Sequence, residues 1–280
     1  MVLKKEFKVK SEFMNVSKIY HAQVFNEDFS NPKKVKDKVN SLISELTKGM
    51  IKEILESEPS SNIVMMLLNA VYFKSKWKKS FDKKKTHPIS FKNADGSTNR
   101  VPMMRMGTKR DQAEFRYAST KDHGVLEIPY KDSISMYIFL PHPGKKIATT
   151  ITKFGVNQLE YGLNSLEPRK FDEVSIPKFK LKQTYDLKKV LTSMGMKKPF
   201  SSRADFMGIS DTEKLRVETS IHKAVIEVHE EGTEAAAATQ LGVGPMSSSF
   251  DFFQANRPFM FLIRDRSNLI TLFAGIVNKL

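Results

Sequence analysis

Long apolar runs indicate that this chain is built around buried β-strands. Residues 63–73 form a near-continuous apolar run of the kind that predicts a strand covered on both faces. Residues 134–140, 259–263 and 269–277 predict further strands, and the last two flank a turn at 265–268. Helical patterns are mixed among these strands without strict alternation, which favours an α+β fold.

Two segments have helical spacing together with helix-ending residues. Residues 30–49 predict a helix, with Ser30 or Asn31 as its cap, Pro32 in its first turn and Gly49 at its end. Residues 187–194 predict a shorter helix that stops near Gly195. Between them, the apolar phase of residues 173–182 shifts at Pro177, which indicates a bulge or a bend there.

Composition excludes several classes of site. The 280 residues contain no cysteine, so thiolate zinc sites, iron–sulfur clusters and a thiol nucleophile are ruled out. No Gly-rich phosphate loop, GxSxG elbow or HExxH motif occurs, and His229-Glu230-Glu231 lacks the second histidine of a zinc motif. Those three polar residues are expected at an exposed strand end, and we predict no enzyme activity, cofactor or metal.

The formal net charge of +15 raises the question of anionic partners. Lysine runs at 33–34, 76–79 and 83–85 lack interleaved aromatic residues, and no nucleic-acid-binding signature is present. A solvated surface is the favoured reading, with no nucleic-acid partner expected. No run is long enough to span a membrane.

The most unusual segment follows a predicted strand at 221–228. Its four consecutive alanines favour a short surface helix, but Gly232 and the lack of a longer amphipathic pattern argue against a stable one. In an extended conformation, Thr233 and Ala235 share one small, uncharged face with every second residue that follows, whereas Glu234 lies on the other face. Such a segment is equipped to enter a sheet as a strand. Its ten residues are Glu230, Glu231, Gly232, Thr233, Glu234, Ala235, Ala236, Ala237, Ala238 and Thr239.

At this segment the sequence resembles the hinge of inhibitory serpins, and the resemblance covers nearly the whole chain. Other serpin-like motifs occur in the same order along the sequence. They are the segments at 69–77, 101–104, 126–130, 176–179, 256–261 and 273–277. The resemblance implies the serpin fold, with three β-sheets, surrounding helices and an exposed reactive loop, in a single domain over residues 1–280 whose hinge and loop span 230–256.

The resemblance also implies a mechanism. A serine protease cleaves the loop as bait and stays joined to it as an acyl-enzyme. The hinge then inserts into the central sheet, drags the protease across and distorts its active site, so that the protease is trapped as a covalent complex. Counting sixteen residues on from Glu230 places the scissile bond at Met246-Ser247. Since Met246 is apolar and flexible, we expect elastase-like or chymotrypsin-like targets.

Two control points are implied by the same resemblance. Asn69 and His222 match the polar shutter positions, where a hydrogen bond would hold strands of the opening sheet together. Trp77, Lys178 and Glu230 match the breach, where the loop first enters and a Lys178–Glu230 ion pair would steady the closed sheet. The protein is expected to be a monomer with a risk of loop–sheet polymerisation.

The resemblance starts partway through the serpin fold, so the N-terminal helices are expected to be missing from a truncated chain or a partial gene model. We expect secretion, assuming a signal peptide lost with that part, and an intracellular location stays open. Asn15 begins a weak glycosylation sequon. The alternatives to inhibition are a serpin-fold carrier or chaperone, and a truncated product that binds a heparin-like polyanion.

Overall fold

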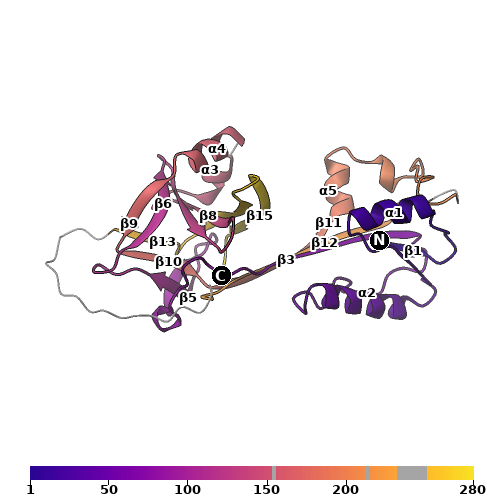
Figure 1. Ribbon diagram of the computed structural model, residues 1–280, viewed down its shortest axis with the longest axis horizontal. Coiled ribbons are helices and arrows are strands. Elements are labelled where there is room, and N and C mark those ends of the chain that lie inside the picture. The colour runs from indigo at the N-terminus through magenta and orange to yellow at the C-terminus, as the bar shows by residue number, and fades with distance from the viewer. Residues whose placement is uncertain (153–155, 212–214, 232–250) are drawn as a thin grey trace. The chain divides into compact units, whose positions relative to one another are not determined.

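The computed structural model describes residues 1–152, 156–211, 215–231 and 251–280 (Figure 1). The chain forms two compact units. Unit 1 comprises Met1–Phe73 and Lys180–Glu227, and unit 2 comprises Lys74–Phe179 and Val228–Leu280. Together they contain three β-sheets, which confirms the α+β prediction and the expected number of sheets.

Unit 1 is built on a five-stranded sheet of order β11-β12-β3-β1-β2. Its strands are β1 (Val2–Lys4), β2 (Phe25–Glu27), β3 (Met65–Phe73), β11 (Phe179–Asp186) and β12 (Thr219–Val228). Its helices are α1 (Ser11–Ile19), α2 (Pro32–Leu46), α5 (Leu187–Ser193) and the short 3₁₀ helix η2 (Lys198–Phe200).

Helix α2 confirms the prediction for residues 30–49. The Asn31 side chain accepts a hydrogen bond from the Lys34 backbone N–H at 3.2 Å, and Gly49 adopts a φ of +76° beyond the helix. Val35 and Val39 are buried in a core cluster of unit 1. The predicted helix at 187–194 is also confirmed, as α5, and Gly195 follows it with a φ of +101°.

Strand β3 is less covered than its sequence predicts. Only Met65, Met66 and Phe73 are buried, whereas residues 67–72 are half-buried or exposed, so the expectation of full cover on both faces is wrong. The two core clusters of unit 1 that contact the strand reach it mainly near its N-terminal end. Over the rest of β3, the described residues of this unit bury the strand less than its apolar sequence predicts.

Unit 2 contains two sheets (Figure 1). The four-stranded sheet has the order β13-β10-β5-β4, from β4 (His87–Lys92), β5 (Thr98–Met106), β10 (Glu173–Pro177) and β13 (Phe252–Gln254). The six-stranded sheet has the order β15-β14-β8-β7-β6-β9, from β6 (Ala113–Ser119), β7 (His123–Pro129), β8 (Ile134–Pro141), β9 (Glu167–Phe171), β14 (Phe259–Asp265) and β15 (Ile270–Val277). Helices α3 (Ile147–Thr152), α4 (Val156–Asn164) and η1 (Lys83–Lys85) complete the unit.

The helices α3 and α4 cover one face of the six-stranded sheet. Ile147 of α3 and Leu159 and Leu163 of α4 pack in a cluster with Val125 and Phe139 of the sheet. The strands predicted at 134–140, 259–263 and 269–277 are β8, β14 and β15, as expected. At Pro177 the predicted bend is confirmed and the bulge is wrong, because β10 ends there and the next strand, β11, joins a different sheet.

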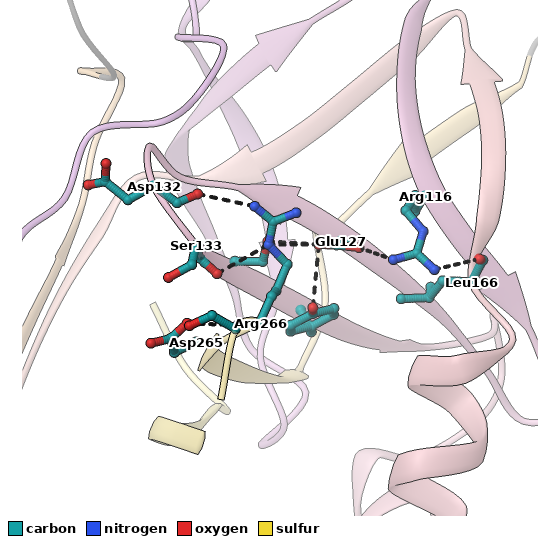
Figure 2. Close-up of polar contacts among 10 residues, drawn as sticks. Arg116, Glu127, Asp132, Ser133, Leu166, Asp265 and Arg266 are labelled. Carbon is teal, nitrogen blue, oxygen red and sulfur yellow. Dashed lines mark hydrogen bonds and ion pairs between the residues drawn. The ribbon is translucent and has the colours of Figure 1, made fainter. Parts of the chain in front are cut away.

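A buried carboxylate joins several strands of the six-stranded sheet (Figure 2). Glu127 of β7 is 3% exposed, and it accepts hydrogen bonds from Arg116 of β6 at 3.0 Å and from Ser135 of β8 at 2.7 Å. Arg266, in the turn between β14 and β15, lies 3.9 Å from the same carboxylate. A buried charge needs such partners, and these contacts link β7 to β6, to β8 and to the turn between β14 and β15.

Tyr137 gives this network a pH dependence. Its hydroxyl donates to Glu127 at 3.4 Å, and burial together with the Glu127 charge raises the pKa of Tyr137 to about 12. The unfolded chain releases this proton near pH 10, so the stabilising contribution is complete below pH 10 and is lost as the pH rises towards 12.

We therefore expect the urea midpoint to fall between pH 10 and pH 12, with a smaller fall in Tyr137→Phe. The control is Tyr161→Phe, because Tyr161 is 73% exposed and should leave the pH profile as it is. Identical profiles for the wild type and Tyr137→Phe would contradict this assignment.

Candidate functional site

The base of the predicted hinge lies against an aromatic cluster in unit 2. Trp77 is 1% exposed and stacks on Tyr130 at a centroid distance of 4.0 Å with 9° between the rings. Phe81 meets Trp77 edge-on at 5.8 Å. The Trp77 Nε1–H donates to the carbonyl of His229 at 2.8 Å, so this cluster fixes the backbone one residue before Glu230.

Glu230 is a buried carboxylate with three described contacts. Its side chain is 5% exposed and accepts hydrogen bonds from Lys178 Nζ and Thr86 Oγ1, each at 3.0 Å. Its backbone carbonyl accepts a bond from the Phe81 N–H at 3.3 Å. The expectation that Glu230 sits at an exposed strand end is therefore wrong, and these partners are the reason that its burial is tolerated.

These contacts also set the protonation state of the site. Burial raises the pKa of the Glu230 carboxyl, but hydrogen bonds from its own backbone, Lys178 and Thr86, together with the Lys178 charge, outweigh burial and lower the pKa overall. Glu230 is consequently ionised at neutral pH, and the contribution of the pair to stability is present above the ordinary carboxyl pKa and lost as the pH falls below it.

Glu231 differs from its neighbour in exposure. Its side chain is 59% exposed and lies 2.5 Å from Lys83 Nζ, while its backbone N–H donates to His229 Nδ1 at 3.1 Å. The hydrogen bond and charge of Lys83 lower the pKa of Glu231, with a smaller contribution from Lys74. In the described part of the chain, neither these residues nor any others form a group of acidic or histidine side chains that could hold a metal.

Asn69 and His222 lie directly opposite each other in unit 1. They are paired residues of β3 and β12, which run parallel as adjacent strands. Asn69 is exposed, and the His222 ring is half-buried, with its centroid 6.1 Å from that of Tyr185. No hydrogen bond joins the two side chains within the residues that the structure describes, so backbone pairing is what holds β3 to β12 at this point.

The remaining predicted residues are distributed as follows. Residues Gly232 to Thr239 of the hinge and the Met246-Ser247 bond lie outside the described residues. Asn15 is exposed in the middle of α1, and the hydroxyl of Ser17 donates to the Met14 carbonyl at 2.9 Å. No helix among the described residues is long and apolar enough to cross a membrane.

Sequence reasoning missed two partners in this site. Tyr130 belongs to the motif at 126–130, but only the structure shows that it stacks on Trp77. Thr86 directly follows η1, which Asp82 caps. Nothing in the sequence around Thr86 indicates that it contacts Glu230. A motif can therefore identify residue types, whereas the pairing of segments far apart in the sequence has to be observed.

Comparison with known proteins decides the family. A family model described as "Serpin (serine protease inhibitor)" matches residues 1–280. This chain belongs to the serpin family. The family description is that of a protease inhibitor and not of an enzyme, and the resemblance seen in the hinge and the ordered motifs is confirmed.

Individual serpins are similar over most of this chain. Alpha-1-antiproteinase F of Cavia porcellus is 34% identical over 99% of this chain and 67% of its own length. The structure of native protease nexin-1 with heparin has a TM-score of 0.88 at 30% identity, covering 100% of this chain and 75% of that one. The complex of thyroxine-binding globulin with thyroxine has a TM-score of 0.87 at 30% identity, over 99% and 73% of the two chains. The chain thus spans about two thirds of the length of the curated relative.

Proposed function

We propose that this serpin is a single-use inhibitor that traps a serine protease by inserting its hinge between β12 and β3. The observation that carries the proposal is the parallel pairing of these two strands, which runs from Thr219 opposite Met66 to Ile226 opposite Phe73. The hinge follows β12 directly. Folding back along β12 makes it antiparallel to β12 and, equally, antiparallel to β3.

This topology favours insertion energetically. One parallel ladder of eight residue pairs would be exchanged for two antiparallel ladders, and antiparallel pairing is slightly more stable per residue. The small alternate residues of the hinge would allow it to pack within the sheet.

The breach contacts of Glu230 hold the start of the hinge in place before cleavage, which is the role proposed for Trp77, Lys178 and Glu230. We also propose Asn69 and His222 as shutter residues, because they lie opposite each other on β3 and β12, the two strands that must separate.

The proposed bait bond is Met246-Ser247, with elastase-like or chymotrypsin-like proteases as targets. An apolar, flexible Met246 fits a hydrophobic primary pocket and lacks the cation that a trypsin-like pocket binds. Replacing Met246 with arginine should therefore lower the rate of chymotrypsin inhibition by about 100-fold or more. It should raise the rate of trypsin inhibition by a similar factor. Rates of inhibition of the two proteases would measure this, with Ser248→Arg as the control. An unchanged preference would contradict the assignment of the bond.

Serpins that bind small molecules define the main alternative. The thyroxine-binding globulin structure contains thyroxine, so a carrier function is a second candidate for this chain. The small, uncharged face of the hinge supports inhibition instead, because a carrier needs no insertable strand. We propose that the inhibitor is a secreted monomer with a single serpin domain and that it can form loop–sheet polymers. We keep Asn15 as a candidate glycosylation site and a heparin-like polyanion as a second candidate partner, the latter because of the +15 charge.

Incubation with chymotrypsin and elastase tests the proposal. We expect a complex of protease and serpin that survives boiling in detergent. Mass spectrometry of the C-terminal peptide released by cleavage should show that its first residue is Ser247. Cleavage of the loop without a covalent complex would reject inhibition and favour the carrier alternative. Cleavage only after a basic residue would reject the proposed bond alone.

A further inference from the structure

The edge strands of the three sheets differ in how well they are protected against pairing with another strand. An edge strand presents backbone N–H and C=O groups on its outer side, and proteins usually protect it with charged residues, proline or a very short strand. Within the described residues, the edge strands are β11 and β2 of the five-stranded sheet, β13 and β4 of the four-stranded sheet, and β15 and β9 of the six-stranded sheet.

Five of these edge strands carry such protection. Strands β2 and β13 are three residues long. Strands β4 and β9 contain Pro88 and Pro168, which have no backbone N–H to donate to a neighbour. Strand β11 carries Lys180, Lys182 and Asp186, whose charges would have to lose water on pairing.

Strand β15 lacks all three kinds of protection. It is eight residues long and contains neither a charged residue nor a proline, and the sequence carries no charge from 267 to 278. Its residues 273–277 pair in regular register with 259–263 of β14, and the one register shift of this pair lies just outside that part. Among the edge strands of the described sheets, β15 is therefore the one that is long and uncharged.

The side chains of β15 extend an apolar layer beyond the part that helices cover. Ala274 and Ile276 lie opposite Leu262 and Met260 of β14, and directly opposite residues share one face of a sheet. Leu262 and Met260 are buried in the cluster formed with α3 and α4, whereas no residue of β15 belongs to that cluster as described. Ile276 is 40% exposed and Leu272 is 45% exposed. An added strand beside β15 would bury this apolar surface.

The charges around β15 identify a second copy of the chain as a suitable partner. Although the chain has a net charge of +15, each end of this strand carries one acidic and one basic residue. Asp265 and Arg266 lie at the turn before β15, and Lys279, which follows it, pairs with Asp95 at 3.0 Å. An antiparallel second copy would bring these two balanced ends together without net repulsion. Between the ends, the uncharged strand is complementary to itself.

We propose that β15 pairs with β15 of a second copy, antiparallel about a two-fold axis, so that two six-stranded sheets join edge to edge. Pairing about Gly275 centres the regular part of the strand and sets Ala274 of each copy opposite Ile276 of the other. The interface is small, so the association is weak and reversible, and the chain is the monomer of the proposed function at low concentration. This pairing uses neither the reactive loop nor the space between β12 and β3.

Sedimentation velocity of the 280-residue chain, from about 1 µM to about 100 µM, tests the association. The mean mass should rise from that of one 32.0 kDa chain towards twice that mass. Ile276→Lys should weaken association by about tenfold, because the two-fold axis places the added charge in the interface twice. The matched control is Met194→Lys, which adds the same charge at a 77% exposed apolar side chain of unit 1 and should leave association unchanged. A mass of one chain at every concentration, or equal losses in the two variants, would overturn the proposal.

Hydrogen exchange locates the contact in the wild-type protein. Backbone amides of β15 should exchange about fivefold more slowly at the higher of these concentrations than at the lower. Amides of β9, at the opposite edge of the same sheet, should exchange equally fast at both. Slower exchange in the hinge, β3 and β12 instead would indicate loop–sheet association and would overturn the edge contact. Since no protease is present, failure here is separate from failure of the inhibitor proposal, which would appear as a missing covalent complex.

Discussion

Replacing Ala235 with arginine is expected to turn this serpin from a protease trap into a protease substrate. In the proposed mechanism Ala235 lies on the small-residue face of the hinge, which must pack within the sheet as the hinge enters between β12 and β3. An arginine there would have to be buried without a partner, at a cost of several kcal/mol. Insertion would then be slower than hydrolysis of the acyl-enzyme, which frees both the protease and the cleaved loop, and the yield of covalent complex should fall by about 100-fold.

Ala236→Arg is the matched control, because the neighbouring residue points to the opposite face of an extended strand. Its side chain stays in water after insertion, so the covalent complex should form nearly as well as in the wild type. Gel quantification of complex against cleaved serpin, after reaction with chymotrypsin, measures both variants. Equal loss in Ala235→Arg and Ala236→Arg would contradict the alternation on which the insertion mechanism depends.

Replacing Glu230 with lysine is expected to destabilise the breach and promote polymerisation. The substitution removes a carboxylate that Lys178 and Thr86 hold at 3.0 Å and places a second ammonium in a site where the native side chain is 5% exposed. Breaking a fully buried pair from one side costs about 3–5 kcal/mol, and an exposed ion pair contributes roughly 0–1 kcal/mol. The cost here is expected between these two limits, because the Glu230 side chain is buried and that of Lys178 is 47% exposed.

Glu231→Lys provides the control for this prediction. It makes the same change of charge one residue later, at a side chain that is 59% exposed. Native gels after mild heating should show polymers of Glu230→Lys well before those of Glu231→Lys, and the thermal midpoint should fall by about 10 °C in the first variant alone. Polymers that appear together in the two variants would show that charge, and not the buried contact, governs opening.

The sequence predicted elements best where local chemistry decides them. Asn31 and Pro32 begin α2, Gly49 follows its end, and these residues act through neighbours that are close in sequence. The strands β8, β14 and β15 were equally predictable, since each is a near-continuous apolar run between turn residues.

Long-range contacts explain where prediction failed. The sequence predicts an exposed Glu230 because the surrounding segment is polar. Its burial is tolerated because Lys178, Thr86 and Phe81, from distant segments, donate hydrogen bonds to it. Asn69 lies in an apolar run that indicates full cover, yet it is exposed because packing in unit 1 concentrates elsewhere on the strand. Burial depends on what the fold brings alongside a residue, and a single segment does not carry that information.

The absence of cysteine allows the most direct test of strand separation. Val71 and Ala224 are opposite each other in β3 and β12, and both are half-buried. Adjacent strands lie about 4.8 Å apart, which a disulfide can span, whereas an inserted strand would move these positions to about 10 Å, which it cannot.

The decisive measurement is formation of the covalent chymotrypsin complex by Val71→Cys with Ala224→Cys, oxidised and then reduced. Single cysteine variants treated with the same oxidant are the controls, and thiol titration establishes that the disulfide has formed. If β3 and β12 must part, the oxidised protein will be cleaved in its loop without forming a complex, and reduction will restore the complex. A complex that forms equally well with the disulfide intact would contradict insertion between these two strands.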